Sequence, residues 1–294
     1  MRRLIRWIDQ EGRISLGVEP RAKGQFHAIV GTDDPMRLLQ GESFPVGQTP
    51  VPLVDDVSLE LGEGLTLLLP WDPPEVWCAG VTYRRSRDAR MAESSVEDVY
   101  DRVYDANRPE LFLKDAGGRR TVGPFEPIGI RGDSTWNVPE AEIGLVVGER
   151  GRILAYTIGN DVSSREIEGA NPLYLSQAKI YAGACAVGPS LYVPLYEPSP
   201  FQLVIRVTGE DGAVAYEDST TTAEMVRDFK ELVAWLVKEN PVPPGTLLLT
   251  GTGLVPDDEF TLLPGQWVEI HVPEIGTLAN PVAHAAELVS GAQV

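Results

Sequence analysis

The chain has 294 residues, of which 43% are hydrophobic and 23% are charged, an ordinary composition for a globular protein. The formal net charge of −18 and the pI of about 4.6 indicate an acidic surface, which repels phosphate backbones and anionic lipids, so we expect no nucleic acid or membrane partner. No apolar run approaches the roughly 18 residues of a membrane span, and the basic start lacks the apolar region of a secretory signal, so a cytoplasmic protein is expected.

Residues 1–70 are expected to form a small β-rich domain. Three short apolar stretches, at 13–19, 26–31 and 65–70, are separated by the glycine, proline and aspartate residues that favour turns. The prolines of "PWDPPE" (70–75) cannot continue a hydrogen-bonded ladder, so this stretch is the predicted boundary. A strand at 76–83 then opens a larger domain, residues 71–294.

Two helices are predicted in the larger domain. The first, at 95–106, begins with a capping box in which Glu97 follows Ser94 by three residues. The second begins with the same pattern at Thr221 and Glu224, and apolar residues then recur at helical spacing as far as an Asn-Pro stop. Both helices are expected to cover a sheet.

Most of the remaining sequence is typical of strands. Strand-length stretches that alternate or run apolar occur at 110–114, 142–148, 153–162, 201–207, 246–251 and 267–272. Gly-rich turns such as "GERGR" join neighbouring stretches into hairpins. The predicted class is therefore α+β, mainly β, with a few covering helices and no alternating βαβ pattern.

The sequence lacks the residues that several kinds of functional site require. Cys78 and Cys185 are far apart and have no CxxC companion, which excludes a disulfide scaffold or a zinc knuckle. The three histidines are scattered, so a histidine-based triad or a His-rich metal site is not expected. There is no GxGxxG, P-loop or GxSxG pattern, so neither a nucleotide cofactor nor a serine nucleophile elbow is supported.

Three carboxylates lie at strand ends that a hairpin turn brings together. Glu140 and Glu142 are two residues apart, so their side chains point to the same face of the strand. Asp161 ends the next strand, which returns across the "GERGR" turn to the Glu140 end. Three hard oxygen donors suit Mg²⁺ or Mn²⁺, with Ca²⁺ as a substitute in crystals. Taken alone, the Glu-x-Glu pair also fits a solvated strand face.

The order of the motifs resembles the fumarylacetoacetate hydrolase superfamily over roughly residues 75–285. The stretches that carry the resemblance are "GVTYRRS", "PEAEIGLVVG", "YTIGNDVSSRE", "QAKIYAGACAVGP", "LLTGTG" and "IGTLANPV". The resemblance implies a mixed β-sandwich roll that binds a divalent cation through Glu140, Glu142 and Asp161. It also implies that Lys179 belongs to the active site, which is closed by the segments that contain Thr252 and Thr277.

One departure from the superfamily narrows the expected chemistry. C–C hydrolases of the superfamily carry "NYxxHxxE", whose His and Glu activate water. The corresponding stretch here is "TYRRSRDA", with Ser86 in place of the His and Ala89 in place of the Glu. Residues 104–114 and 170–189 are very similar to another branch, the 2-keto-3-deoxy-D-arabinonate dehydratases. The resemblance therefore implies removal of water from a sugar acid.

The expected reaction converts a 2-keto-3-deoxypentonate to 2,5-dioxopentanoate. A 2-keto acid chelates the cation, which stabilises the enolate formed when a C3 proton leaves, and the C4 hydroxyl then departs. One group must accept a proton and another must donate one. Lys179 is the first candidate for this acid–base work and Glu110 is the second, although an ion pair with Arg108 explains Glu110 equally well.

Six residues are candidates for substrate binding. Tyr83 and Arg84 precede the helix predicted at 95–106, in a region that is a mobile lid in the superfamily, although a solvated arginine cluster is an equal alternative. Lys114 either contacts the substrate carboxylate or pairs with the three acidic residues. The remaining candidates are Tyr174, Thr252 and Thr277.

Two other functions remain open at this point. One is a C–C hydrolase or an oxaloacetate-type decarboxylase of the same superfamily, and the other is a non-catalytic binding protein for sugar acids. The expected partner is a small 2-keto acid, and the superfamily implies a homodimer or a homotetramer.

Overall fold

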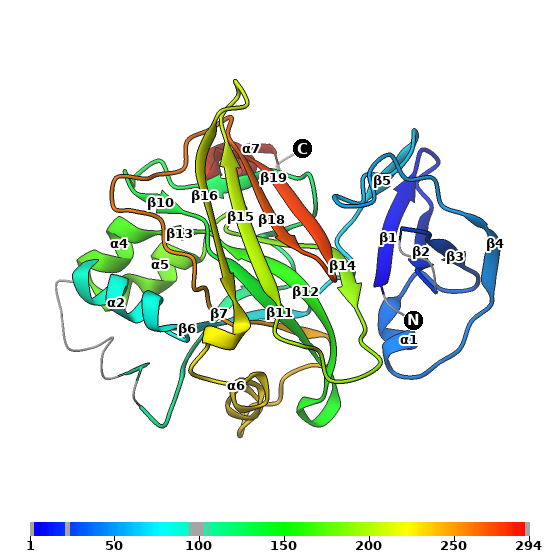
Figure 1. Ribbon diagram of the computed structural model, residues 1–294, viewed down its shortest axis with the longest axis horizontal. Coiled ribbons are helices and arrows are strands. Elements are labelled where there is room, and N and C mark those ends of the chain that lie inside the picture. Colours follow the sequence, from blue (N-terminus) through cyan, green and yellow to red (C-terminus); the bar gives the residue numbers. More distant parts are fainter. Residues whose placement is uncertain (1–2, 21–23, 94–102, 105, 292–294) are drawn as a thin grey trace.

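Two β-sheets form the framework of the protein in the computed structural model, which describes residues 3–20, 24–93, 103–104 and 106–291 (Figure 1). The larger sheet contains strands in the order β4-β3-β2-β1-β14-β12-β11-β17-β6-β7, with β5 and β8 added beside this path. The smaller sheet has the order β16-β15-β18-β19-β9. A pair of short strands, β10 (Asn137–Val138) and β13 (Ser163–Ser164), lies beside them.

Along the chain, most strands follow one another without a helix between them. In the larger sheet the strands are β1 (Arg3–Asp9), β2 (Ile14–Val18), β3 (His27–Ile29), β4 (Val46–Pro50), β5 (Leu65–Leu67), β6 (Glu75–Gly80), β7 (Glu110–Ala116), β8 (Thr121–Val122), β11 (Ala141–Val147), β12 (Ile153–Asp161), β14 (Cys185–Tyr192) and β17 (Thr246–Leu249). In the smaller sheet they are β9 (Ile128–Ile130), β15 (Gln202–Thr208), β16 (Val214–Thr221), β18 (Trp267–Val272) and β19 (Gly276–His284). The mainly β class predicted from the sequence is confirmed.

Short helices complete the described structure. They are α1 (Pro35–Leu39), α2 (Arg84–Glu93), α4 (Arg165–Ala170), α5 (Leu175–Lys179), α6 (Phe229–Leu236) and α7 (Ala285–Gly291), with 3₁₀ turns at Glu149–Gly151, Pro172–Tyr174 and Thr222–Glu224. Helices α2, α4 and α5 gather at one end of the sheets, away from the N-terminal strands (Figure 1). None of the helices in the described part of the chain has the length and apolar character needed to span a membrane.

The main core lies between the two sheets. Along β11, Ile143 and Leu145 belong to this core, as do Leu203 and Ile205 of β15 on the opposing sheet. Val146 points the other way and packs in a second cluster with residues of the N-terminal strands. Because side chains alternate along a strand, Glu142 shares the face of Val146, opposite the main core.

The N-terminal strands extend the larger sheet. Strand β1 pairs with β14, with Leu4 opposite Leu191. The larger sheet therefore joins strands from both sides of the boundary predicted at 70–75. Arg3 and Glu19 form a buried ion pair of 2.6 Å beside this pairing. The division into residues 1–70 and 71–294 stays a prediction.

The predicted start of the second helix is wrong. Helix α6 begins at Phe229, with the Asp228 carboxylate accepting a hydrogen bond of 2.7 Å from the Glu231 N–H. Thr221 instead caps a 3₁₀ turn, and the Val226 N–H then donates to the Thr82 carbonyl at 2.9 Å. That contact holds the chain extended where the capping-box pattern predicted a helix. Most of the helix expected at 95–106 lies outside the described residues, and α2 just before it was not predicted.

The acidic composition leads to a first prediction about stability. We expect the melting temperature to rise as KCl is increased from 0.1 to 1 M, because the net charge of −18 repels itself and salt shortens the screening length from about 10 to about 3 Å. Thermal unfolding followed by circular dichroism measures this, and NaCl at the same ionic strengths should give the same rise. A melting temperature that stays level or falls over this range would contradict the prediction.

Candidate metal centre and active site

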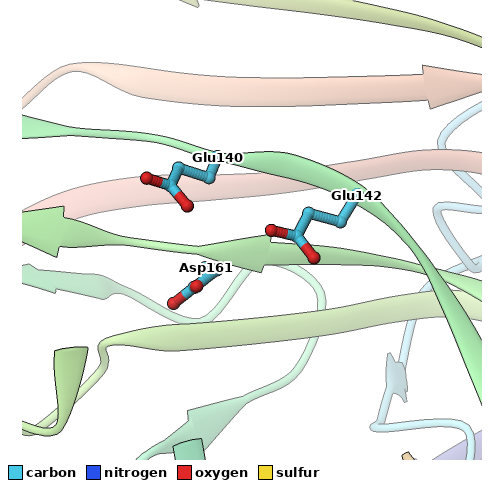
Figure 2. Close-up of side chains that lie close together, drawn as sticks. All are labelled: Glu140, Glu142 and Asp161. Carbon is cyan, nitrogen blue, oxygen red and sulfur yellow. The ribbon is translucent and has the colours of Figure 1, made fainter. Parts of the chain in front are cut away.

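Three carboxylates converge where β11 begins and β12 ends. The two strands are antiparallel, with Ala141 opposite Asn160, and the Asp161 N–H donates to the Glu140 carbonyl at 2.9 Å. This register places Glu140 beside Asp161, and Glu142 follows on the same face (Figure 2). All three side chains are buried, and one oxygen of each lies within 4.8 Å of the others. The hairpin therefore brings together the carboxylates that the sequence predicted as a cluster.

Three buried cations lie against this cluster. The Lys179 ammonium donates to Glu140 Oε2 at 2.7 Å and to Asp161 Oδ2 at 3.0 Å. Lys114 forms an ion pair with Asp161 and donates to the Val162 carbonyl at 3.0 Å. Arg165 lies 3.0 Å from Glu140 Oε1. Buried carboxylates need such partners, because an uncompensated charge in the interior is strongly destabilising.

Glu142 has a different environment. Its Oε2 accepts a hydrogen bond of 2.6 Å from the Gly251 N–H, in the loop after β17. Burial raises the pKa of Glu142 well above its usual range, and the charges of Asp161 and then Glu140 add to this effect. The ionised form of Glu142 is therefore unfavourable until another positive charge enters the site.

The carboxylate cluster fits a hard divalent cation. Oxygen ligands about 2.1 Å from one Mg²⁺ lie at most about 4.2 Å from one another, which small side-chain rotations reach from the observed spacing. The donors are all oxygen, as Mg²⁺ and Mn²⁺ prefer. A cation held by Glu140, Glu142 and Asp161 would also supply the positive charge that Glu142 needs.

A small cavity opens beside the cluster. Its volume is only about 10 Å³, which is room for about one water molecule, and all three carboxylates line it. Glu110 at the start of β7 and Thr252 in the loop after β17 also line this cavity. Ser86 from α2 and Glu168 from α4 are also among its lining residues.

The other predicted residues lie at different distances from the cavity. Tyr83 is buried and packs on Gly253, and burial raises the pKa of its hydroxyl, so the phenol stays protonated. Arg84 is exposed and lies 3.9 Å from Asp88, and Tyr174 is nearly half exposed. Thr277 contacts His271 Nδ1 at 2.9 Å. None of these four is among the described residues that line the cavity.

Two charged residues of the site were not predicted from the sequence. Arg165 and Glu168 are both almost fully buried on α4, one turn apart. Arg165 lies in the "NDVSSRE" stretch (160–166), four residues after Asp161, Glu168 lies two residues beyond that stretch, and Ser164 caps their helix. A helix start immediately after a metal-ligand strand was the signal that could have found them.

Comparison with known proteins places this site in a family. Residues 75–283 match the family model described as fumarylacetoacetate (FAA) hydrolase C-terminal. A probable 2-keto-3-deoxyxylonate dehydratase of Haloferax volcanii is 52% identical over 215 residues, 73% of this chain and 74% of the relative. The 2-dehydro-3-deoxy-D-arabinonate dehydratase of Saccharolobus solfataricus is 44% identical over 219 residues, 72% of this chain and 73% of the relative.

A solved structure extends the similarity beyond the matched segment. It is 2-keto-3-deoxy-D-arabinonate dehydratase in complex with magnesium and 2,5-dioxopentanoate, 33% identical in sequence to this chain. The alignment has a TM-score of 0.83 and covers 96% of this chain and 99% of that one. Because the family model spans most of the chain, the chain belongs to the fumarylacetoacetate hydrolase family.

Proposed function

We propose that this chain is a Mg²⁺-dependent hydro-lyase that dehydrates 2-keto-3-deoxypentonate, a 2-keto-3-deoxy sugar acid, to 2,5-dioxopentanoate. The observation that carries the proposal is the buried cluster of Glu140, Glu142 and Asp161 beside a small cavity, with Lys179 in contact with two of the three. The relatives named as dehydratases, and the similar structure that holds magnesium and 2,5-dioxopentanoate, support the same reaction.

The reaction removes one proton from C3 and the hydroxyl from C4, which together leave as water. This leaves a C3=C4 double bond beside the C5 alcohol. A proton then leaves C5 and one is added at C3, which gives a C4=C5 enol, and the enol tautomerises to the C5 aldehyde of 2,5-dioxopentanoate by protonation at C4 and loss of the hydroxyl proton. Held by Glu140, Glu142 and Asp161, a divalent cation would supply Lewis-acid stabilisation of the negative charge that develops when the C3 proton leaves. The residues of the chain must orient the substrate, exclude water and move the protons of these steps.

Lys179 is the proposed acid–base residue of first choice. Its ammonium lies within hydrogen-bond distance of two metal-site carboxylates and is almost fully buried, so it is held beside the bound substrate. Glu110, on the cavity wall, is the second. Lys114 and Thr252 are proposed to help to bind the substrate carboxylate, Lys114 from behind Asp161 and Thr252 from the cavity wall. Four other predicted residues do not line the cavity, namely Tyr83, Arg84, Tyr174 and Thr277. They can bind the substrate only if it extends beyond the cavity to contact them, or if a nearby segment moves.

A comparison of substrates tests the proposed function. Purified protein with Mg²⁺ is incubated with 2-keto-3-deoxypentonate, oxaloacetate and an acylpyruvate in parallel, and products are followed by mass spectrometry. We expect 2,5-dioxopentanoate from the first, a loss of at least about 10²-fold in rate with EDTA, and recovery when Mg²⁺ is restored. Turnover of the acylpyruvate alone would favour the hydrolase, and loss of CO₂ from oxaloacetate alone would favour the decarboxylase. Binding of all three without turnover would favour the binding protein.

We also propose a cytoplasmic homodimer or homotetramer. This proposal rests on the family and on the absence of a membrane-spanning helix in the described residues. Light scattering coupled to size-exclusion chromatography would give the mass, and a value near the 32.1 kDa of one chain would contradict the assembly.

A further inference from the structure

An aromatic ring lies beside the Lys179 ammonium. Phe112 lines the same cavity as the three metal-site carboxylates, and the centre of its ring lies 5.6 Å from Lys179 Nζ. A cation within about 6 Å of a ring centre is attracted to the negative face of the ring, and the attraction is stronger where water is excluded. Lys179 is only 2% exposed, so little water screens this contact.

The sequence of β7 explains why the ring lies there. Glu110, Phe112 and Lys114 alternate along this strand, so their side chains share one face of it. Glu110 and Phe112 line the cavity, and Lys114 forms an ion pair with Asp161. This face of β7 is therefore turned toward the metal cluster, and the ring lies between two charged residues of its own strand.

Two hydrogen bonds of Lys179 go to carboxylates that the metal also needs. The ammonium donates to Glu140 and Asp161, and both belong to the cluster that fits a divalent cation. Their negative charge would then be shared with the metal, which also repels the ammonium, since like charges repel strongly where water is excluded. Lys114, by contrast, also donates to the Val162 carbonyl, which is outside the cluster. The aromatic face is a partner of Lys179 whose attraction the metal does not neutralise.

We propose that Phe112 is a positioning residue, whose ring holds the Lys179 ammonium at the cavity wall by a cation–π interaction once a divalent cation occupies the carboxylate cluster. This inference rests on the proposed function, because it assumes that Lys179 is the acid–base residue beside a bound metal. It explains how an ammonium group and a metal ion, which repel each other, stay together beside one small substrate.

A series of fluorinated phenylalanines at position 112 tests the interaction. Fluorine withdraws electrons from the face of a ring and changes its size little, so 4-fluoro-, 3,5-difluoro- and 3,4,5-trifluorophenylalanine weaken a cation–π interaction in steps. We expect the turnover number with 2-keto-3-deoxypentonate and Mg²⁺ to fall at each step, by about tenfold over the series, while KM stays within about twofold of the wild-type value. Phe112→Leu has no ring, and its turnover number should fall by about 30-fold.

Phe44→Leu is the matched control. The Phe44 ring also faces a cation, with the guanidinium carbon of Arg37 4.6 Å from its centre, but Arg37 pairs with Glu42 at the surface. This variant therefore removes a ring of the same kind from a cation outside the active site. It should keep the wild-type turnover number and KM.

Nuclear magnetic resonance shows the position of the ammonium group without turnover. The chain has five lysines, so lysine labelled with ¹³C at Cε gives few signals, and the signal of Lys179 is the one that is missing from Lys179→Met. A ring that faces the end of the side chain shifts the Cε protons upfield, so this signal should lie upfield of its position in Phe112→Leu. We expect the difference between the two proteins to persist when Mg²⁺ is added.

The outcomes separate this inference from the proposed function. If the turnover number does not follow fluorination, or if only KM changes, the ring fills space or contacts the substrate, and the inference is overturned. Loss of the difference between the signals on addition of Mg²⁺ would overturn it as well. If the wild-type protein dehydrates nothing but the difference persists with Mg²⁺, the ring does hold the ammonium, and the proposed reaction alone is overturned.

Discussion

Glu142→Gln is expected to lower the turnover number by about three orders of magnitude or more, and at the same time to stabilise the metal-free protein. The activity falls because one of three metal ligands becomes a neutral amide, and several kcal/mol of Lewis-acid stabilisation is lost. The stability rises because the variant removes a buried carboxyl group whose ionised form is unfavourable beside two other carboxylates, so folding no longer requires Glu142 to take up a proton or to bury a charge. The amide oxygen still accepts the hydrogen bond from Gly251. We expect a gain of about 1–3 kcal/mol in the free energy of unfolding at pH 8 in EDTA.

The raised pKa of Glu142 also determines how the stability of the protein changes with pH. Burial raises the pKa of Glu142 in the folded protein, so the folded state holds a proton that the unfolded state has already released. The contribution of Glu142 to stability is therefore fully present at pH values below the ordinary glutamate pKa, and it is lost as pH rises through the raised value. Glu142→Gln has no such proton, so its stability should fall less with rising pH than that of the wild type.

Urea unfolding between pH 5 and 9 in EDTA measures this effect, and melting temperatures with and without Mg²⁺ measure the loss of the metal site. Glu149→Gln is the matched control, because Glu149 is exposed in the turn that joins β11 to β12. It should keep both the wild-type pH dependence and the rise in melting temperature with Mg²⁺. A Glu142→Gln protein that is less stable than wild type in EDTA, or that is still stabilised by Mg²⁺ to the same extent, would contradict the assignment of Glu142 to the metal site.

Lys179→Met is expected to lower the turnover number by about 10²–10⁴-fold, the range typical of a lost acid–base residue. The same variant leaves Glu140 and Asp161 without the ammonium group that contacts both of them, so the metal-free protein should lose about 3–5 kcal/mol of stability. A divalent cation can replace that lost positive charge. We therefore expect Mg²⁺ to raise the melting temperature of Lys179→Met by more than it raises that of the wild type.

Turnover assays and differential scanning fluorimetry with a Mg²⁺ titration test these expectations together. The control is Lys230→Met, because the Lys230 side chain is exposed and pairs with Glu197 at the surface. It should leave turnover and the Mg²⁺ response unchanged. If Lys179→Met keeps wild-type turnover, Lys179 is not the acid–base residue, and Glu110 becomes the first candidate. If Mg²⁺ stabilises the variant less than it does the wild type, the ammonium supports metal binding and does not compete with it.

Part of the site could be predicted because it depends on contacts close in sequence. Glu140 and Glu142 are two residues apart on one strand, and a tight turn returns the chain so that Asp161 meets them. Strand alternation and hairpin pairing are regular enough to be deduced from spacing alone. The same regularity explains why the strands of the larger domain with clear apolar or alternating stretches were predicted, namely β6, β7, β11, β12, β15, β17 and β18. The long strands β14, β16 and β19 were not predicted, and neither were β1 and β4 of the N-terminal part.

Other features depended on packing between distant segments. The capping box at Thr221 predicted a helix, but the pairing of this segment with Thr82 keeps it extended. Thr277 lies in a segment typical of the family site, yet its side chain contacts His271. Glu168 gives no periodic signal in the sequence, and only the packing of α4 beside the cavity makes it part of the site.

The sequence by itself determined the mainly β class, the carboxylate cluster and the expectation that water is removed, since these follow from residue type, strand periodicity and the order of motifs. The tertiary structure alone decided which cations compensate the cluster, because Lys114, Arg165 and Lys179 reach it from β7, α4 and α5. The physical reason is that spacing along a chain determines only which face a side chain occupies, whereas the neighbours of a buried charge are set by how separate elements pack around it.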